Sequence, residues 1–410
     1  MKNILYLSYD GVTDTLGQSQ ILPYLKGLCT EGYQFFLIGF EKKEAYKKQK
    51  RIVEKEIEDA TIRWLPMKYH KWPPVISTIY DILVMRKVAS LMCRKNDIQI
   101  VHCRSYIPML VGIYLKQKHG IKLLFDMRGF WANERVDGKL WKLKNPIYRK
   151  IYSYFKSKEL AFVNQADHIV SLTHSGKEEI ISGRLFSEKN TKVDAQKISV
   201  IPCATDFDLF NPERVSMQRI NHWKHKLKIR DTDKILIYLG SLGTWYMVDE
   251  MLQFYMHFQK KNPEYKFLFV TKDDTQALHA KAHSIGLNQA NIIVTSANRN
   301  QVPELLKLAD LGIFFIQPAY SKKASSAVKM GEMIAMELPF ITNKGVGDVE
   351  KLINEIEFGV AIDLDKIDIE LEASLFSPQH KKTTATKYLM NHKDAVIRYS
   401  EIYESLLHYE

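Results

Sequence analysis

The sequence predicts an α/β protein built from two Rossmann-like domains. Residues 3–40 form an apolar strand, a turn, a helix and a second apolar strand, which is typical of the start of a doubly wound parallel sheet. Residues 234–246 begin the same pattern again, with an apolar run that ends in glycines. Residues 311–341 contain two apolar strands joined by a helix, and apolar runs without alternation indicate strands buried on both faces. At 410 residues, the chain is long enough for two sizeable cores.

The composition is that of a soluble globular protein. Hydrophobic residues make up 46% and charged residues 26% of the chain, and no run of about eighteen apolar residues predicts a membrane span. The first nine residues become polar too quickly for a signal peptide and indicate a strand. The four cysteines are scattered without metal-ligand spacing, so we expect reduced thiols and a cytoplasmic location.

The net charge of +12 is unevenly distributed along the chain. Residues 1–200 contain 34 Lys and Arg against 20 Asp and Glu, whereas residues 201–410 contain 25 against 27. A basic half beside a neutral half suggests an anionic partner: a membrane surface, a lipid-phosphate acceptor or nucleic acid. Because no zinc finger, RNA-binding aromatic motif or helix-turn-helix signature is present, we favour a membrane or anionic acceptor and expect no nucleic acid. A basic half that only aids solubility is the alternative.

The main candidate site lies in the stretch from Ser325 to Ile341. A helix that begins between two parallel strands offers free N–H groups and a favourable dipole to a phosphate. Ser326, Lys329 and Glu332 are spaced three apart, so they would share one face of this helix. A hydroxyl and a cation suit phosphate oxygens, and a carboxylate accepts hydrogen bonds from sugar hydroxyls. The alternative is a solvated helix face with incidental charges.

This stretch resembles the donor-binding segment of the family 4 glycosyltransferases, which have the two-Rossmann GT-B fold with an interdomain cleft. The family usually shows two glutamates separated by seven residues and followed by Leu-Pro. Glu332 and Leu338-Pro339 match this pattern, but Ala324 occupies the first glutamate position. The sequence is similar to a branch of the family that lacks this glutamate. The resemblance implies transfer of a sugar from a nucleotide-sugar to an acceptor, with retention of configuration and without a metal or other cofactor.

The resemblance also implies a donor site in the second domain. Relatives have Gly-Arg-Leu and then a lysine after the first strand, whereas this chain has Ser241 and Tyr246 at these places. The glycines that remain allow backbone N–H groups to cradle phosphate, and Lys329, Lys272 or Arg128 could supply the missing charge. Residues 298–302 correspond to the segment that contacts the nucleotide base. The full predicted donor set is Gly240, Ser241, Leu242, Gly243, Thr244, Lys272, Asn298, Arg299, Val302, Ser325, Ser326, Lys329 and Glu332.

Polar residues in the first half follow predicted strands. His102 and Arg104 end the strand at 97–105, and Arg128 follows the strand at 121–126, where many relatives have a histidine. Arginine stays charged and cannot act as a base, but it can hold a phosphate or developing negative charge. We expect Arg128 to act in catalysis with Lys329 and Glu332. The alternative is a structural arginine paired with Asp126 or Glu134.

Further residues are expected at the acceptor side. Gly17, Gln18 and Ser19 resemble the family's glycine-containing cleft loop, although an ordinary turn is an equal alternative for the glycine. His174 could contact the acceptor, while His168 fits a histidine whose hydrogen bonds are satisfied. The helices predicted at 41–58 and 75–92 are interpreted as a solvated face and a core-packing helix, and membrane contact is the alternative for both.

The predicted domains are residues 1–200 for the acceptor, residues 201–385 for the donor, and a helix at 386–410 that returns to the first domain. Asp206 and Asp208 match a short metal-binding pattern, but their position at the domain junction argues against a metal. We expect a hexosyltransferase that uses a lipid-linked or saccharide acceptor in cell-surface glycan synthesis, peripheral on the inner face of the membrane. The alternatives are a non-catalytic GT-B binding subunit and a nucleotide-sugar epimerase.

Overall fold

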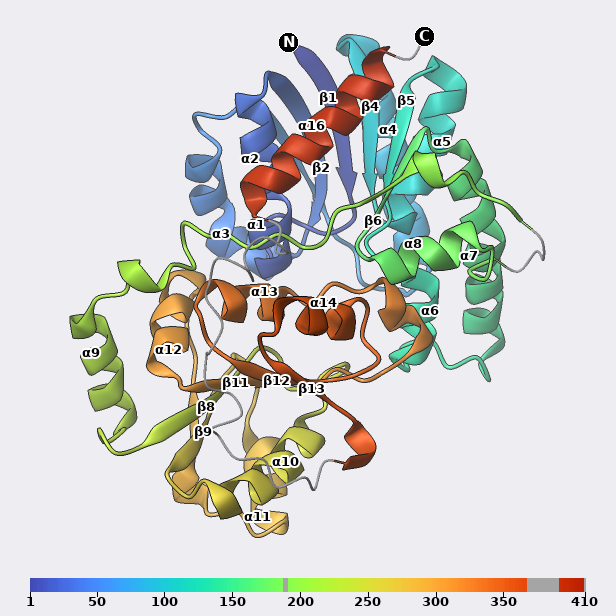
Figure 1. Ribbon diagram of the computed structural model, residues 1–410. Helices are drawn as coiled ribbons and strands as arrows, with labels where there is room; N and C mark the ends of the chain where they lie inside the picture. The colour runs from blue at the N-terminus through green and yellow to red at the C-terminus, as the bar shows by residue number, and fades with distance from the viewer. Residues whose placement is uncertain (187–190, 367–390, 409–410) are drawn as a thin grey trace. The chain divides into compact units, whose positions relative to one another are not determined.

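A computed structural model describes residues 1–186, 191–366 and 391–408 (Figure 1). The chain divides into two compact units. The first contains Met1–Cys203 and His392–Glu410, and the second contains Ala204–Asn391. The helix expected at 386–410 is α16 (His392–His408), and residues 386–390 and 409–410 of that expectation lie outside the described residues.

The first unit is built on a seven-stranded sheet in which every pair of neighbours is parallel. Its strand order is β3-β2-β1-β4-β5-β6-β7. The central strands are apolar and fully buried, as their uninterrupted hydrophobic runs predict. The strands are β1 (Lys2–Ser8), β2 (Tyr33–Glu41), β3 (Ile62–Lys68), β4 (Ile98–Arg104), β5 (Lys122–Asp126), β6 (His168–Ser171) and β7 (Ile198–Val200).

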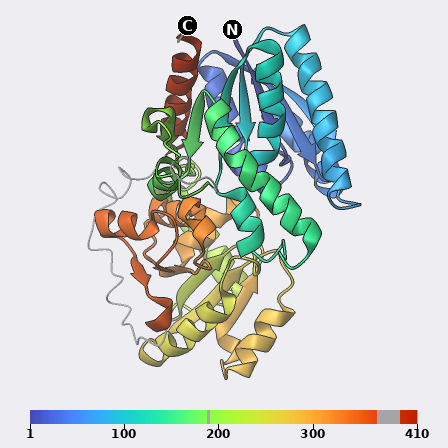
Figure 2. The same cartoon turned by 90° about the vertical axis from the view of Figure 1, so that its right-hand side faces the viewer.

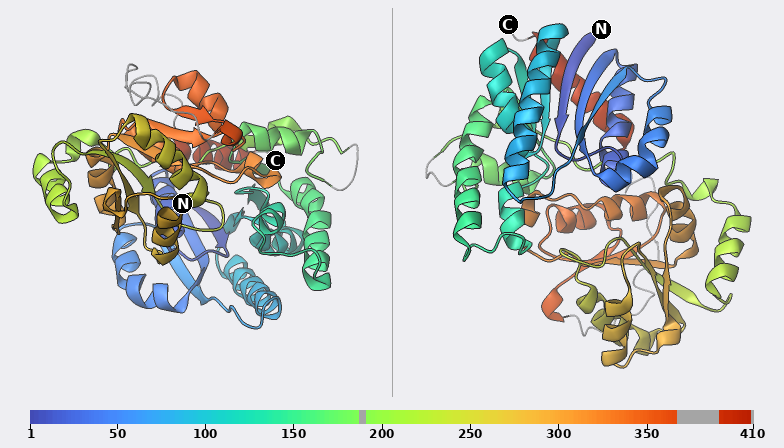
Figure 3. Two further views of the ribbon diagram at one scale, coloured as in Figure 1. Left: turned by 90° about the horizontal axis from the view of Figure 1, so that it is seen from below. Right: turned by 180° about the vertical axis from the view of Figure 1, so that it is seen from behind.

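Helices cover both faces of this sheet. On one face α16 packs against α2, and on the other α4, α5 and α7 lie side by side (Figures 2 and 3). The start of β1 and the end of α16 lie close together at one end of the unit, where Lys2 contacts Glu404 (Figure 2). The helices are α1 (Thr15–Gln20), α2 (Leu22–Thr30), α3 (Lys43–Glu56), α4 (Ile76–Lys95), α5 (Tyr106–His119), α6 (Trp131–Asp137), α7 (Pro146–Gln165), α8 (His174–Ile181) and α16.

The second unit repeats this design with six parallel strands in the order β10-β9-β8-β11-β12-β13. One continuous hydrophobic core packs around them. The strands are β8 (Lys234–Leu239), β9 (Tyr265–Val270), β10 (Ile292–Thr295), β11 (Leu311–Phe314), β12 (Phe340–Asn343) and β13 (Val360–Ile362). The helices are α9 (Met217–Leu227), α10 (Val248–Lys261), α11 (Gln276–Ser284), α12 (Val302–Leu308), α13 (Val328–Ala335) and α14 (Val349–Ile356).

Each sheet has one topological switch point. The first strand of each unit pairs with neighbours on both sides, so the chain leaves β1 towards β2 but later returns beside it as β4. In the same way β8 pairs with β9 on one side and with β11 on the other. Loops diverge at the carboxyl ends of such strands, and open α/β sheets bind their ligands there. The prediction of two parallel doubly wound domains is therefore confirmed, and it fixes where sites should be sought.

One element boundary differs from the sequence prediction. Gly17, Gln18 and Ser19 were expected in a loop, but they lie in α1, and α2 starts at Leu22 because Pro23 cannot donate the hydrogen bond that would join the two helices. The helix α7 begins at Pro146. Asn145 caps it by accepting from the N–H of Ile147 at 2.9 Å, and proline is favourable in the first turn.

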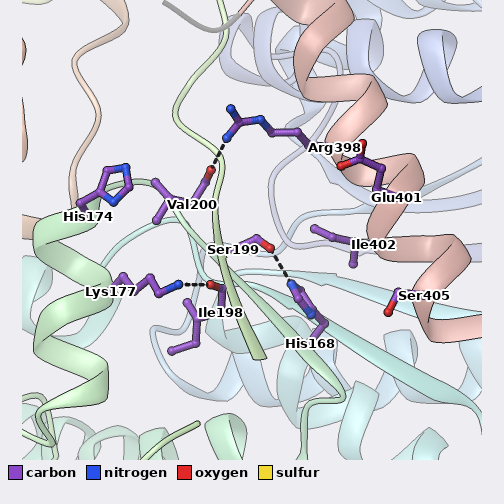
Figure 4. A pocket seen from close by; sticks show the side chains of 10 residues that line it. All are labelled: His168, His174, Lys177, Ile198, Ser199, Val200, Arg398, Glu401, Ile402 and Ser405. Carbon is purple, nitrogen blue, oxygen red and sulfur yellow. Dashed lines mark hydrogen bonds between the residues drawn. The ribbon is translucent and has the colours of Figure 1, made fainter. Parts of the chain in front are cut away.

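The edge strand β7 is covered by side chains rather than by another strand. Lys177 of α8 donates to the carbonyl of Ile198 at 2.6 Å, and Arg398 of α16 donates to that of Val200 at 3.2 Å (Figure 4). Cations on outward carbonyls block pairing with a further strand. They border a pocket of about 460 Å³ lined by His168, His174, Lys177, Ile198, Ser199, Val200, Arg398, Glu401, Ile402 and Ser405.

His168 lies in this pocket with its Nε2 2.9 Å from the hydroxyl of Ser199 (Figure 4). Burial, together with repulsion from Lys177 and Lys197, lowers the pKa of His168 from 6.5 to about 4. The unfolded chain therefore binds a proton that the folded chain rejects between these pH values, and the stability that His168 contributes above pH 6.5 is lost as the pH falls towards 4.

We predict that His168→Gln, whose amide can replace Nε2 at Ser199, loses less stability than the wild type between pH 6.5 and pH 4. Urea unfolding of both proteins across this range measures the effect. Parallel pH profiles of the two free energies of unfolding would contradict it. His222→Gln, at an exposed histidine on α9, is the matched control and should leave the profile unchanged.

Candidate functional site

The carboxyl ends of β8 and β11 form the switch point of the second unit, and the loops that follow them are joined. The N–H of Met247 donates to the carbonyl of Phe315 at 3.0 Å, and the N–H of Gln317 donates to that of Trp245 at 2.8 Å. The buried side chain of Asn343 on β12 bonds both backbone groups of Ile316, at 2.7 and 2.9 Å. The two loops therefore form one fixed platform at the place where this fold binds ligands.

Lys329 of α13 reaches back to this platform. Gly240 follows β8 with φ of +132°, and a Cβ added there would lie 2.8 Å from the Lys329 Nζ. The glycine thus permits both the unusual backbone conformation and the close approach of the ammonium group. The same Nζ lies 3.5 Å from the centroid of the Tyr246 ring. Tyr246 occupies the place where the resemblance expects a lysine, and its aromatic ring contacts a lysine that comes from the helix α13.

A second cation is held in the same way. The Nζ of Lys322 lies 3.7 Å from the centroid of the Trp245 ring and 3.5 Å from the hydroxyl of Ser325. Two consecutive aromatic residues therefore each carry one lysine of the segment after β11, and cation–π contacts of this kind contribute about 0.5–2 kcal/mol each. Lys322 was missed in the sequence analysis. The sequence contains two consecutive aromatic residues after β8 and two lysines after β11, but only the fold shows that each lysine contacts one of the aromatic rings.

Glu332 and Arg299 form a direct ion pair. The Glu332 side chain is almost fully buried, the residue being 7% exposed, and its Oε1 accepts from the Arg299 Nη1 at 2.9 Å. Burial raises the pKa of Glu332, while the charges of Arg299 and Lys329 oppose that rise. The Arg299 guanidinium also lies 5.1 Å from the Phe210 ring centroid. The site thus contains a buried carboxylate, held by one cation and near a second, that can accept hydrogen bonds from hydroxyl groups.

Other predicted donor residues lie nearby with different surroundings. Ser326 was expected on the same helical face as Lys329 and Glu332, but it precedes the first turn of α13. The N–H of Leu242, expected to face phosphate, donates instead to Asp273 at 2.7 Å. Asn298 forms a capping box with Gln301, so its side chain acts in the local turn. Ser241, Gly243, Thr244 and Lys272 are exposed, whereas Val302, Ser325 and Ser326 are half-buried.

The predicted residues of the first unit meet at a buried carboxylate. Asp126 ends β5, and its carboxylate oxygens lie 3.5 Å from His102 Nε2, 3.5 Å from Arg104 Nη1 and 3.7 Å from Arg128 Nη1. Burial alone would raise the pKa of Asp126, but Arg128, His102 and Arg104 together lower it. The alternative expectation for Arg128, a pair with Asp126, is therefore the geometry that is present.

This cluster, Asp126 with His102, Arg104 and Arg128, has more donors than acceptors. Burial and the two arginines lower the pKa of His102, so two full positive charges face one carboxylate. Within the described residues, His102 Nε2, Arg104 Nε and Asp126 Oδ1 are buried without a hydrogen-bond partner. His102 Nδ1 lies 2.7 Å from the Tyr403 hydroxyl, which connects the cluster to α16. An excess of buried positive charge is able to receive an anion.

The expected cleft loop has a different structure. Gly17, Gln18 and Ser19 lie in α1, so the loop assignment is wrong; a Cβ at Gly17 would lie 2.3 Å from the Gly11 carbonyl oxygen, which shows that close packing requires this glycine. The loop proper is fixed by buried Glu41, which accepts from the N–H groups of Val12 and Thr13 at 2.9 and 3.1 Å.

His174 lines the pocket beside β7, whereas the pocket lining does not include His102 or Arg104.

No group of three or more His, Cys, Asp or Glu in the described ranges could hold a metal ion. Asp206 accepts from the N–H groups of Asp208 and Leu209, which is a local turn. In the same ranges, no helix is long and apolar enough to cross a membrane.

Comparison with known families finds matches over both units. The model "Glycosyltransferase Family 4" matches residues 22–209, and the model "Glycosyl transferases group 1" matches residues 219–370. A search of curated proteins finds no match.

Three solved structures share the whole fold. A glycosyltransferase from Rickettsia africae is 16% identical, with a TM-score of 0.70 over 100% of this chain and 99% of its own. The sucrose-phosphate synthase of Thermosynechococcus elongatus is 12% identical, with a TM-score of 0.71 over the full length of both chains. HepE of Anabaena, in complex with UDP-glucose, is 11% identical, with a TM-score of 0.66 over 99% of this chain and 100% of its own. Since the two family models together match most of both units and these structures share the GT-B fold, the chain belongs to the family 4 glycosyltransferases and is an enzyme of sugar transfer.

Proposed function

We propose that the second unit binds a nucleotide-sugar and that its sugar is transferred to a lipid-linked or saccharide acceptor, with retention of configuration and without a metal. The observation that carries this proposal is the position of Lys329 against Gly240 and Tyr246, at the carboxyl ends of β8 and β11. A diphosphate is the group that a glycine turn and an ammonium suit best. The structure of HepE with UDP-glucose supports a uridine nucleotide as the first donor to test.

In this proposal, different residues around Lys329 bind different parts of the donor. Lys329 and Lys322 compensate the diphosphate charge in place of the family's arginine and lysine. Glu332 accepts hydrogen bonds from hydroxyl groups of the ribose or the sugar, and Arg299 orients this carboxylate and opposes the rise that burial causes in its pKa. When the bond between the anomeric carbon and the phosphate oxygen breaks, its electron pair stays on the diphosphate. Preorganised cations that stabilise this charge supply much of the rate enhancement.

The first unit supplies the acceptor side in this proposal. The cluster around Asp126 offers two arginines against one carboxylate, which suits a phosphorylated or otherwise anionic acceptor. Arg128 then neutralises negative charge that develops during transfer. An anionic acceptor and the basic first half of the chain support a role in cell-surface glycan synthesis on the cytoplasmic face of a membrane, which is part of this proposal.

Nucleotide binding without metal tests the donor proposal directly. We expect one of UDP, GDP or ADP to raise the thermal unfolding temperature of the purified protein in the presence of a chelator. A ligand at a hundred times its dissociation constant should add about 2.7 kcal/mol to the free energy of unfolding. A shift that requires added magnesium, or the absence of a shift with all three nucleotides and their sugars, would overturn the proposal.

Removal of the Lys329 charge should weaken diphosphate binding. We predict that Lys329→Met raises the dissociation constant for UDP about 10- to 100-fold, since hydrogen bonds to charged groups contribute about 1.5–3 kcal/mol. Uridine, which lacks the diphosphate, should bind equally to both proteins. Isothermal titration of both ligands measures the difference.

Matched variants separate charge from position in the same experiment. Lys323→Met removes an exposed lysine of the same segment and should leave UDP binding unchanged. Tyr246→Phe keeps the ring under Lys329 and should bind like the wild type, whereas Tyr246→Leu should lose part of the affinity. Equal binding of UDP by Lys329→Met and the wild type would show that another group carries the diphosphate.

Glu332 should be needed for hydroxyl recognition. We predict that Glu332→Gln lowers donor affinity about tenfold or more, because a charged acceptor becomes neutral and Arg299 loses its buried partner. If the carboxylate binds the ribose, the variant should lose affinity for UDP and UDP-sugar equally. If it binds the sugar, the variant should lose affinity for UDP-sugar alone. Unchanged affinity for both ligands, with unchanged turnover, would remove Glu332 from the site.

A further inference from the structure

The helix α4 was expected to pack in the core, yet it presents a large apolar surface. Trp72, just before it, is 80% exposed and Ile76 is 66% exposed. Ile79, Tyr80 and Leu83 are also exposed, and positions 76, 79, 80 and 83 fall on one face of α4, with Trp72 in the loop just before it. Scattered exposed apolar residues are ordinary, but five on two consecutive turns and the preceding loop form a patch that indicates an interaction surface.

The same stretch is basic without exposed acidic residues. Between Lys68 and Lys95 the sequence contains six basic residues and one acidic residue, Asp81. Asp81 is fully buried, and its carboxylate contacts His70 and the Tyr9 hydroxyl. The six cations are all exposed: Lys68, Lys71, Arg86, Lys87, Arg94 and Lys95.

The outer face of α4 therefore changes along its length. Its first two turns are apolar, and the next turns on that face carry Arg86 and Lys87, then Arg94 and Lys95. An apolar end flanked by lysine and arginine is the arrangement of a segment that dips into a bilayer beside anionic headgroups. Tryptophan and tyrosine favour this interfacial region because their rings are apolar at one end and polar at the other.

A neighbouring helix has the same character. Residues 139–158, which include the start of α7, contain seven basic residues and no acidic one. Leu140, Ile147 and Tyr154 of this stretch are exposed. Contacts place α4 beside α5 and α5 beside α7, on one face of the sheet (Figure 2). Both α4 and α7 begin near the carboxyl edge of the sheet, because α4 follows β3 and the carboxyl end of α7 leads into β6.

We propose that the apolar patch formed by Trp72, Ile76, Ile79, Tyr80 and Leu83 inserts into an anionic lipid bilayer, with Lys71 and the lysines and arginines of α4 on the headgroups. A second copy of this chain fits the surface less well, because a symmetric contact would bring the six cations of each copy into one interface, and the stretch from Lys68 to Lys95 has no exposed acidic residue to pair with them. The inference deepens the peripheral location given under the proposed function and names the surface that produces it. Binding to vesicles can be measured without sugar transfer, so the two proposals fail separately.

Vesicle sedimentation of the full chain tests the proposal. The wild type should bind vesicles of phosphatidylglycerol and phosphatidylcholine but not vesicles of phosphatidylcholine alone, and salt should weaken binding because the Debye length falls from about 10 Å at 0.1 M to about 3 Å at 1 M. Lys71→Gln with Lys87→Gln should lower the affinity about 25-fold, at about fivefold for each charge. The paired variant Lys260→Gln with Lys261→Gln, on α10, should bind like the wild type.

The apolar patch is tested by Trp72→Ser with Ile76→Ser, which should lose vesicle binding while the thermal shift with nucleotide stays at the wild-type value. Met217→Ser, at a residue that is 65% exposed on α9, is the matched control and should retain binding. Equal binding by the patch variant and the wild type would overturn the proposal. So would a wild type that self-associates without lipid and becomes monomeric in the patch variant, because the face would then be a contact between copies.

Discussion

Hydrogen bonding between parallel strands, with the first strand of each unit paired on both sides, is the constraint on which the rest of the structure depends. It places β4 beside β1 and β11 beside β8, so residues far apart in the sequence end at the same edge. Lys329 meets Gly240 and Tyr246 only because α13 follows β11 and the glycine turn follows β8. The donor chemistry proposed for this enzyme is thus a consequence of strand order, in which one element supplies the glycine and aromatic platform and another supplies the cation.

The balance of buried positive and negative charges differs between the two units. In the second, Glu332 has Arg299 as a direct partner, so the pair is close to neutral and sits beside the additional cation Lys329. In the first, Asp126 faces both Arg104 and Arg128, so positive charge is in excess. Taking each ion of a buried pair out of water costs on the order of several kcal/mol, which makes such groups expensive to keep for packing alone. The Asp126 cluster lies at the carboxyl end of β5 and suits a ligand with negative charge. The Glu332 pair lies on α13 and suits a ligand with hydroxyl groups.

Part of the excess positive charge in the first half of the chain lies on one face of the first unit. The excess of basic residues in the first half includes those on the outer turns of α4 and at the start of α7, beside exposed apolar side chains. A surface of this kind would hold the enzyme at the bilayer where a lipid-linked acceptor resides, and effective concentration at a surface favours encounter with such an acceptor. The opposite face of the sheet carries α2 and α16, with α16 connected to the Asp126 cluster through Tyr403.

The sequence by itself determined the two doubly wound domains, most strand positions and the pairing of Lys329 and Glu332 on one helix, because these depend on local hydrophobic runs, turns and helical spacing. It could not determine the contact of Lys322 with Trp245, the ion pair between Arg299 and Glu332, or the convergence of His102, Arg104 and Arg128 on Asp126, since each depends on which strands become neighbours. Gly17 was misplaced in a loop although Asp14, a residue type that favours the N-cap, precedes the helix; the Asp14 side chain makes no cap hydrogen bond and accepts from Lys42 instead. The exposed face of α4 was also decided by tertiary structure: the helix is apolar on more than one side, and only packing against the sheet shows which side remains open.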